Sequence, residues 1–121
     1  MNYALIGCGR ISSNHIKAAI ENGLNILALC DVNETIIDNF INLNELDKSS
    51  IKKYTSHKEM LKNEKIDIVS IAVKSSLHAP IAIDCINMGV NTIIEKPIAL
   101  SLKDADEIIR ISKKNNIKVC A

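Results

Sequence analysis

The chain has 121 residues, a formal net charge of +1 and 47% apolar residues, but only 2% aromatic ones. This length is enough for one domain that buries a core of its own. The balanced charge argues against a broad basic surface for nucleic acid or an anionic membrane, and the scarcity of aromatic side chains argues against stacking platforms for single-stranded nucleic acid.

Short apolar runs alternate with longer amphipathic ones along the whole chain. In chain order, the pattern predicts strands over residues 3–7, 25–30, 53–56, 66–73, 91–97 and 117–121, with helices over residues 11–22, 34–46, 57–64, 77–89 and 101–116. The buried face of the first helix is expected at Ile11, Ile16, Ala19 and Ile20. Strands that are apolar on both faces and separated by helices are typical of an α/β fold, in which helices cover both sides of a parallel sheet.

Two of the four glycines stand close together, directly after the first apolar run. Gly7, Gly9 and Ser12 form the pattern G-x-G-x-x-S between the first predicted strand and the first predicted helix. In dinucleotide-binding folds the first glycine makes the tight turn, the second lets the backbone approach a pyrophosphate, and a third small residue lets helix and strand pack closely. Two glycines can also be simple turn residues, so the motif depends on its context.

The context that supports the glycine motif is an acidic residue at the expected distance from it in the sequence. Asp31 ends the second predicted strand, about twenty residues after the glycines, where a carboxylate accepts hydrogen bonds from the adenosine ribose. This carboxylate would repel a 2′-phosphate, so the sequence predicts NAD rather than NADP. A role for Asp31 as a helix cap or turn former before Asn33 ranks second, and it is compatible with the first.

A second cluster closes the fifth predicted strand, where Glu95, Lys96 and Pro97 follow one another. Ligands of an open parallel sheet collect outside the carboxyl ends of its strands. Lys96 is therefore expected on the same edge as Gly9 and Asp31, although most lysines are simply solvated. Pro97 stiffens the backbone that carries it.

Together the segments ALIGCGRISSNH, LCDVNE and IAVKSSLHAPIAIDCINMGVNTIIEKPIALSLKDADEI resemble the N-terminal domain of the glucose–fructose oxidoreductase/inositol dehydrogenase (Gfo/Idh/MocA) family. The resemblance covers essentially the whole chain and implies a Rossmann-type doubly wound sheet of strand order 3-2-1-4-5-6. It implies that residues 1–121 are the dinucleotide-binding domain. The substrate domain, which in the family follows it, is expected outside this chain, because the chain stops within the sixth predicted strand.

The resemblance also implies a reaction and a set of residues. Family members transfer a hydride between a nicotinamide cofactor and a hydroxyl-bearing carbon, usually of a sugar, a cyclitol or a nucleotide sugar, and the full-length protein is expected to be a homo-oligomer. The lysine of the family's E-K-P motif maps onto Lys96 as the catalytic residue, and the Lys96–Pro97 peptide is expected to be cis. The expected cofactor-binding residues are Gly7, Gly9, Arg10, Ile11, Asp31, Val32, Ala72, Val73, Lys74, His78, Glu95, Lys96 and Pro97.

One loop departs from the family pattern. Where the family commonly has T-P-N-x-x-H after the fourth strand, residues 73–78 read VKSSLH, so only His78 matches. Lys74 either reaches the cofactor or points into water, and water is the preferred interpretation. His15 is expected to be mainly structural and His57 to be solvated. No metal site is expected, because the three histidines lack carboxylate or cysteine partners at ligand spacing.

The four cysteines, Cys8, Cys30, Cys85 and Cys120, include no C-x-x-C pair and are interpreted as reduced thiols in the core of a cytoplasmic protein. No signal peptide or bilayer-spanning run is visible. Two other functions compete with the oxidoreductase. A stand-alone regulatory module that senses dinucleotides would share the glycine turn and Asp31 but would not need Lys96. A methyltransferase would carry an acid directly before its glycines, where this chain has apolar residues.

Overall fold

The computed structural model describes all residues, 1–121. Its strands are β1 (Asn2–Ile6), β2 (Asn25–Cys30), β3 (Lys52–Tyr54), β4 (Ile68–Ile71), β5 (Asn91–Ile94) and β6 (Val119–Cys120). Its helices are α1 (Ser12–Glu21), α2 (Glu34–Leu43), α3 (His57–Asn63), α4 (His78–Asn87) and α5 (Leu102–Lys114), and a 3-10 helix, η1 (Ser75–Leu77), precedes α4. Every predicted element is present, and most are one to three residues shorter at their ends than the sequence pattern indicated.

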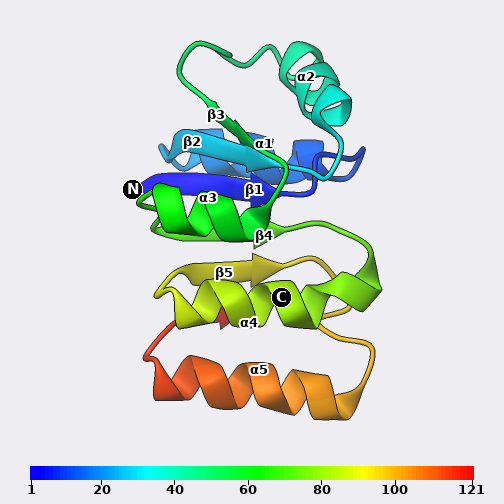
Figure 1. The fold of residues 1–121 in the computed structure, drawn as a ribbon, viewed down its shortest axis with the longest axis vertical. Helices are drawn as coiled ribbons and strands as arrows, with labels where there is room; N and C mark the ends of the chain where they lie inside the picture. Colours follow the sequence, from blue (N-terminus) through cyan, green and yellow to red (C-terminus); the bar gives the residue numbers. More distant parts are fainter.

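The six strands form one parallel sheet in the order β3-β2-β1-β4-β5-β6, which confirms the predicted doubly wound topology (Figure 1). The arrowheads of the strands point to the same side of the molecule, because every connection between neighbouring strands is a crossover. The loops that leave β1, β2, β3, β4 and β5 therefore meet at one carboxyl edge of the sheet.

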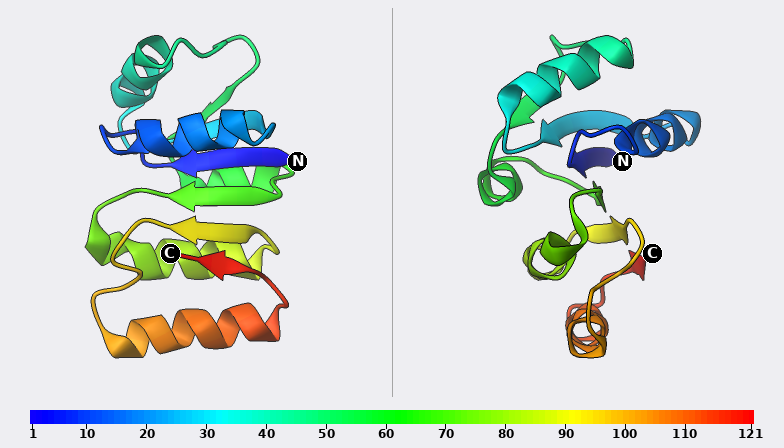
Figure 2. Two further views of the ribbon diagram at one scale, coloured as in Figure 1. Left: turned by 180° about the vertical axis from the view of Figure 1, so that it is seen from behind. Right: turned by 90° about the vertical axis from the view of Figure 1, so that its right-hand side faces the viewer.

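The helices cover the two faces of the sheet unequally (Figure 2). On one face, α1 and α2 pack over β1 and β2 around a cluster of 10 buried residues that includes Tyr3, Ile16 and Phe40. On the other face, α3, α4 and α5 pack around a cluster of 18 buried residues that includes Met60, Ile86 and Ile108. Each fully buried aliphatic side chain contributes on the order of 2 kcal/mol, so these two clusters are what hold the edge loops in place.

Local sequence accounts for where the helices begin. Asn33, Ser56 and Ser101 precede α2, α3 and α5, and each side-chain oxygen accepts a hydrogen bond from a backbone N–H of the first turn. The bond from the Asp104 N–H to Ser101 Oγ is 3.1 Å. The N-terminus of α1 has no such side-chain cap, and its first residues belong to the glycine turn.

Two expectations about burial need correction. In α1, Ile16 and Ala19 are buried as predicted, but Ile11 and Ile20 are half exposed, because the contact stripe of the helix on the sheet is narrower than the apolar pattern. All four cysteines are free, and Cys8, Cys30 and Cys85 are buried. Cys120 is exposed rather than in the core, because β6 is a two-residue edge strand.

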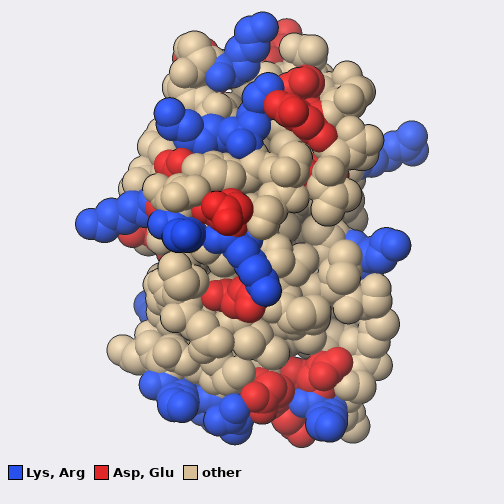
Figure 3. Space-filling model, viewed as in Figure 1, with Lys and Arg blue, Asp and Glu red and all other residues tan.

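Basic and acidic side chains are interspersed over the face in Figure 3, without a broad patch of one sign. None of the helices is both long and apolar enough to cross a bilayer.

Candidate functional site

A cavity of about 320 Å³ opens at the carboxyl edge, where β1, β2 and β4 end. Of the residues expected to bind a cofactor, the following line it: Gly7, Gly9, Asp31, Val32, Ala72, Val73 and Lys74. Its remaining wall consists of Ile6, Cys30, Thr55, His57, Leu77 and Ile81. A larger hollow of about 600 Å³ lies beside α2 and is lined by surface side chains such as Lys48, far from the glycine turn. The edge cavity is therefore the candidate site.

Gly7 is required by the backbone itself. Its φ of +96° is in the region that favours glycine, and a Cβ atom there would lie 2.4 Å from the Ala72 carbonyl oxygen. The turn is held by the Gly7 N–H, which donates to the Cys30 carbonyl at 2.8 Å, and by the Ser12 hydroxyl, which donates to the Gly7 carbonyl at 2.6 Å. Ser12 is completely buried, so the third position of the motif ties α1 to the turn.

Gly9 differs from Gly7 in having open space where a side chain would be. No atom lies within 4 Å of a Cβ built on Gly9, and its backbone φ is not in the left-handed region. Folding therefore does not require glycine at this position. Gly9 nevertheless lines the cavity, just ahead of the N-terminus of α1, where backbone N–H groups favour an anion.

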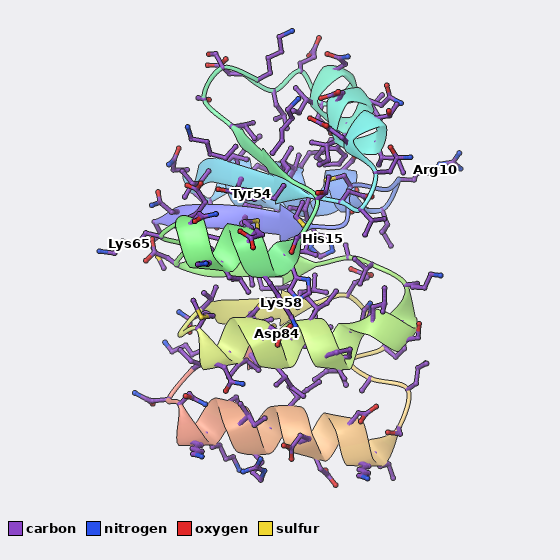
Figure 4. All side chains as sticks on the ribbon, in the orientation of Figure 1. Arg10, His15, Tyr54, Lys58, Lys65 and Asp84 are labelled. Carbon is purple, nitrogen blue, oxygen red and sulfur yellow. The ribbon has the colours of Figure 1, made fainter.

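Arg10 and Ile11 follow Gly9 but do not line the cavity. Both are exposed, and Arg10 points away from the domain into solvent (Figure 4). A contact between either side chain and a bound cofactor stays a prediction.

Asp31 has the turn-forming role that ranked second in the sequence analysis, and its role toward the adenosine ribose stays a prediction. Its Oδ2 accepts a hydrogen bond from the Cys8 N–H at 3.0 Å, and its Oδ1 accepts one from the Asn33 N–H at 3.1 Å. The turn-forming role, which ranked second, is thus present, and it fastens the end of β2 to the glycine turn. The same carboxylate lines the cavity, so lone pairs that these two bonds leave free face it.

His78 is inside the protein and not in the cavity. It is 1% exposed, with Nδ1 2.6 Å from the Pro97 carbonyl oxygen and Nε2 2.9 Å from the Val73 carbonyl oxygen. Because carbonyl oxygens only accept, a neutral ring donates to one of them and a doubly protonated ring donates to both. His78 therefore joins the loop after β4 to the turn after β5, and its nitrogens are not free for a ligand.

Lys96 lies on the turn after β5 at the carboxyl edge of the sheet, and Glu95, Lys96 and Pro97 are all outside the lining of the cavity. The preceding Glu95 is held by His15 of α1, with 2.7 Å between His15 Nε2 and Glu95 Oε2. The Lys96–Pro97 peptide is cis, as expected. Lys96 is exposed and makes no ion pair within the chain, so its ammonium group is available to a ligand.

His57 is a cavity residue that the sequence analysis placed wrongly. It is not solvated: its side chain is 21% exposed, Nε2 lies 2.8 Å from Asp84 Oδ2, and the ring lines the cavity. Figure 4 shows Asp84 in the middle of α4, facing α3. The position of His57 in the sequence could have indicated this location. His57 follows the end of β3 by three residues and so lies at the same edge of the sheet as Gly9 and Asp31.

The cavity offers no thiol nucleophile. Burial, followed by the nearby Asp31 carboxylate, raises the pKa of Cys30 in the cavity wall to about 12, and the same causes raise the pKa of Cys8 to about 12. Both thiols are therefore protonated at neutral pH. No three side chains among His, Cys, Asp and Glu gather in a way that could hold a metal ion.

A sheet of this topology, with a glycine turn, an acid after the second strand and a cavity between them, defines a dinucleotide-binding α/β domain. The comparison with known families agrees. The model of the oxidoreductase family with an NAD-binding Rossmann fold (Gfo/Idh/MocA) matches residues 1–121, and the chain belongs to this family as its NAD-binding domain.

Individual relatives are distant in sequence but close in structure. Oxidoreductase P35 of Formosa agariphila is 29% identical over 98% of the chain, and inositol 2-dehydrogenase of Salmonella typhimurium is 26% identical over 92%. The crystal structure of the WlbA dehydrogenase from Bordetella pertussis, in complex with NADH and UDP-GlcNAcA, superposes with a TM-score of 0.87 at 26% identity over 98% of the chain.

The chain spans about a third of the length of these relatives. It covers 36% of oxidoreductase P35, 33% of the inositol dehydrogenase and 35% of the WlbA dehydrogenase.

Proposed function

We propose that the chain binds NAD at the carboxyl-edge cavity and is the cofactor domain of an enzyme that oxidises or reduces a hydroxyl-bearing carbon of a sugar, a cyclitol or a nucleotide sugar. The observation that carries the proposal is the contrast between the two glycines. Gly7 is explained by folding, whereas Gly9 faces open space at the cavity mouth. A glycine that the fold does not need, in front of a helix N-terminus, suits the close approach of a pyrophosphate.

The other cavity residues fit the rest of a dinucleotide. Asp31 would accept hydrogen bonds from the adenosine ribose through its remaining lone pairs. Val32 is 88% exposed and Leu77 is 42% exposed on the cavity wall, and two exposed apolar side chains there suit the flat faces of the adenine base. Ala72 and Val73 would contact the nicotinamide half, and Lys74 is exposed at the rim.

The cofactor, when bound, accepts or donates the hydride; the protein's own part would fall to Lys96. An ammonium group beside the substrate oxygen stabilises the negative charge that develops there, or moves its proton. The bonds from His15 to Glu95 and from His78 to Pro97 support this role, because they restrain the turn on both sides of Lys96. A regulatory module that only senses the dinucleotide would have no use for such restraint.

The carboxylate of Asp31 supports a preference for NAD over NADP. Its two oxygens are held by backbone N–H groups, so it cannot turn away from an added 2′-phosphate without losing those bonds. Repulsion between the two charges is worth on the order of 1 kcal/mol at a surface site.

The test is a calorimetric titration of residues 1–121 with NAD and with NADP. We expect NAD to bind, NADP to bind more weakly, and residues 1–121 to show no turnover of sugars, because they span only about a third of the length of the relatives. No binding of either dinucleotide would contradict the proposal. The catalytic role of Lys96 is tested separately with Lys96→Ala in the longer protein, where kcat is expected to fall strongly while NAD affinity stays nearly unchanged.

A further inference from the structure

The far wall of the cavity contains a histidine that none of the roles above uses. The order of groups along the carboxyl edge follows the order of the strands. The glycine turn ends β1, Asp31 ends β2, and the Asp31 N–H donates to the Tyr54 carbonyl at the end of β3, at 3.1 Å. Thr55 and His57 come next, and both line the cavity. A base attached to a ribose at Asp31 therefore falls on the His57 side of the site.

The tautomer of His57 is set by its partner. Asp84 Oδ2 is a carboxylate oxygen and accepts, so the proton lies on Nε2, which donates across 2.8 Å. The second nitrogen, Nδ1, then carries a lone pair, and no group of the protein bonds to it. This ring lines the cavity, where a ligand can supply a donor to Nδ1.

The neighbouring groups indicate what kind of donor this is. Val32 and Leu77 present apolar surface on the same wall, which suits a planar base rather than a sugar or a phosphate. Lys74, which also lines the cavity, can only donate. His57 is thus the nitrogen acceptor on this part of the wall, and the exocyclic amine of adenine is the donor that a dinucleotide carries.

We propose that His57, with its tautomer set by Asp84, reads the base of the dinucleotide: Nδ1 accepts a hydrogen bond from the adenine amine and faces the lone pairs of a 6-oxo purine unfavourably. This inference rests on the proposed NAD site and makes His57 a specificity-determining residue. A hydrogen bond that one ligand makes and its analogue cannot make discriminates between them, because the polar group of the site is left unpaired.

The experiment compares NAD with nicotinamide hypoxanthine dinucleotide, in which a carbonyl replaces the amine, by calorimetric titration of residues 1–121. NAD is expected to bind about fivefold to tenfold more tightly, the usual range for one hydrogen bond. In His57→Phe, which keeps a ring of similar size, the two affinities are expected to become equal. In Asp84→Ala the ratio is expected to fall as well, because the ring can then present an N–H to the carbonyl.

The matched control is Lys62→Ala, on the exposed side of α3 outside the cavity, where the ratio is expected to be that of the unmodified chain. Equal affinity of the unmodified chain for both dinucleotides would overturn the inference and leave the proposed function standing. Retention of the full ratio by a folded His57→Phe would overturn it too. Failure of the unmodified chain to bind NAD would overturn the proposed function and the inference together.

Discussion

Two turns meet at the carboxyl edge, and they are held by different means. The glycine turn after β1 is closed mainly by neighbours in the sequence and by backbone groups: Gly7 takes the left-handed conformation and the Ser12 hydroxyl donates back to it. One side chain from the adjacent strand end, Asp31, adds a bond to the Cys8 N–H. The turn after β5 is closed by side chains from other elements. His15 reaches Glu95 from α1, 80 residues away in the sequence, and His78 reaches Pro97 from α4.

The two turns have different requirements: the first needs a particular backbone shape, and the second needs a backbone that is held in place. A glycine turn needs the absence of side chains, so that its backbone can bend sharply and approach a phosphate. The turn after β5 carries a functional side chain, Lys96, and a side chain can be aimed only if the backbone beneath it is held. Substitutions in the turn after β1 are therefore expected to act on backbone shape, and substitutions around the turn after β5 on the bonds that restrain it.

The largest expected effect is that of Gly7→Ala. A Cβ at this position meets the Ala72 backbone carbonyl at 2.4 Å and forces alanine into a φ of +96°, so the sheet and the turn cannot both keep their geometry. We expect the free energy of unfolding to fall by about 3 kcal/mol or more. Chemical denaturation followed by circular dichroism measures it, and a loss below 1 kcal/mol would mean that the turn is not constrained by Ala72.

His78→Ala comes second. It removes the buried ring that bridges the carbonyl oxygens of Val73 and Pro97, so at least one of them loses its donor and a filled volume is emptied. We expect a loss of about 2 to 3 kcal/mol. The control is His15→Ala, which breaks a partly exposed pair and should cost less than about 1 kcal/mol. Equal costs in denaturation experiments would argue against different roles for the two histidines.

Gly9→Ala is expected to weaken NAD binding without changing the stability of the fold. Because nothing lies within 4 Å of the added methyl group, stability should change by less than about 0.5 kcal/mol. The methyl group would nevertheless stand in the path of the pyrophosphate, so the affinity for NAD is expected to fall at least about tenfold, or about 1.4 kcal/mol. The pair Gly7→Ala and Gly9→Ala thus separates a structural glycine from a binding one, and unchanged affinity in a calorimetric titration would remove Gly9 from the site.

Asp31→Asn should have a smaller effect. The amide keeps the size of the side chain and one oxygen acceptor, while the negative charge is lost. We expect the preference for NAD over NADP to shrink about fivefold, which is on the order of 1 kcal/mol of charge repulsion. Parallel titrations with both dinucleotides measure the ratio. An unchanged ratio would mean that the carboxylate serves only the turn.

The smallest expected effect concerns the three buried cysteines, which should not react with a thiol reagent in the folded chain. Burial raises the pKa of Cys8, Cys30 and Cys85 to about 12, so at pH 8 only about one thiol in ten thousand is ionised. A thiol reagent should modify only the exposed Cys120 in the folded chain and all four thiols after unfolding. Mass spectrometry counts the labels, and rapid labelling of Cys8 would show that the glycine turn opens.

The secondary structure, the parallel sheet and the glycine turn could be predicted from the sequence, because they depend on residues that are near one another in the chain. The alternation of apolar and amphipathic runs determined the strands, the helices and the parallel sheet, since periodicity states directly which faces are buried. The G-x-G pattern and Asp31 identified the glycine turn, because turn conformation and strand ends are encoded within a few residues. The resemblance carried by Glu95, Lys96 and Pro97 extended this to the second turn.

The remaining features were decided by packing between distant parts of the chain. The three histidines look alike in the sequence, but their surroundings differ. His15 restrains Glu95, and His57 lines the cavity and is paired with Asp84. His78 is buried between two loops. Each outcome depends on which helix lies over which strand end, across separations of 80, 27 and 19 residues. A histidine's partners, and hence which nitrogen carries its proton, are properties of that arrangement, so the tertiary structure alone assigns them.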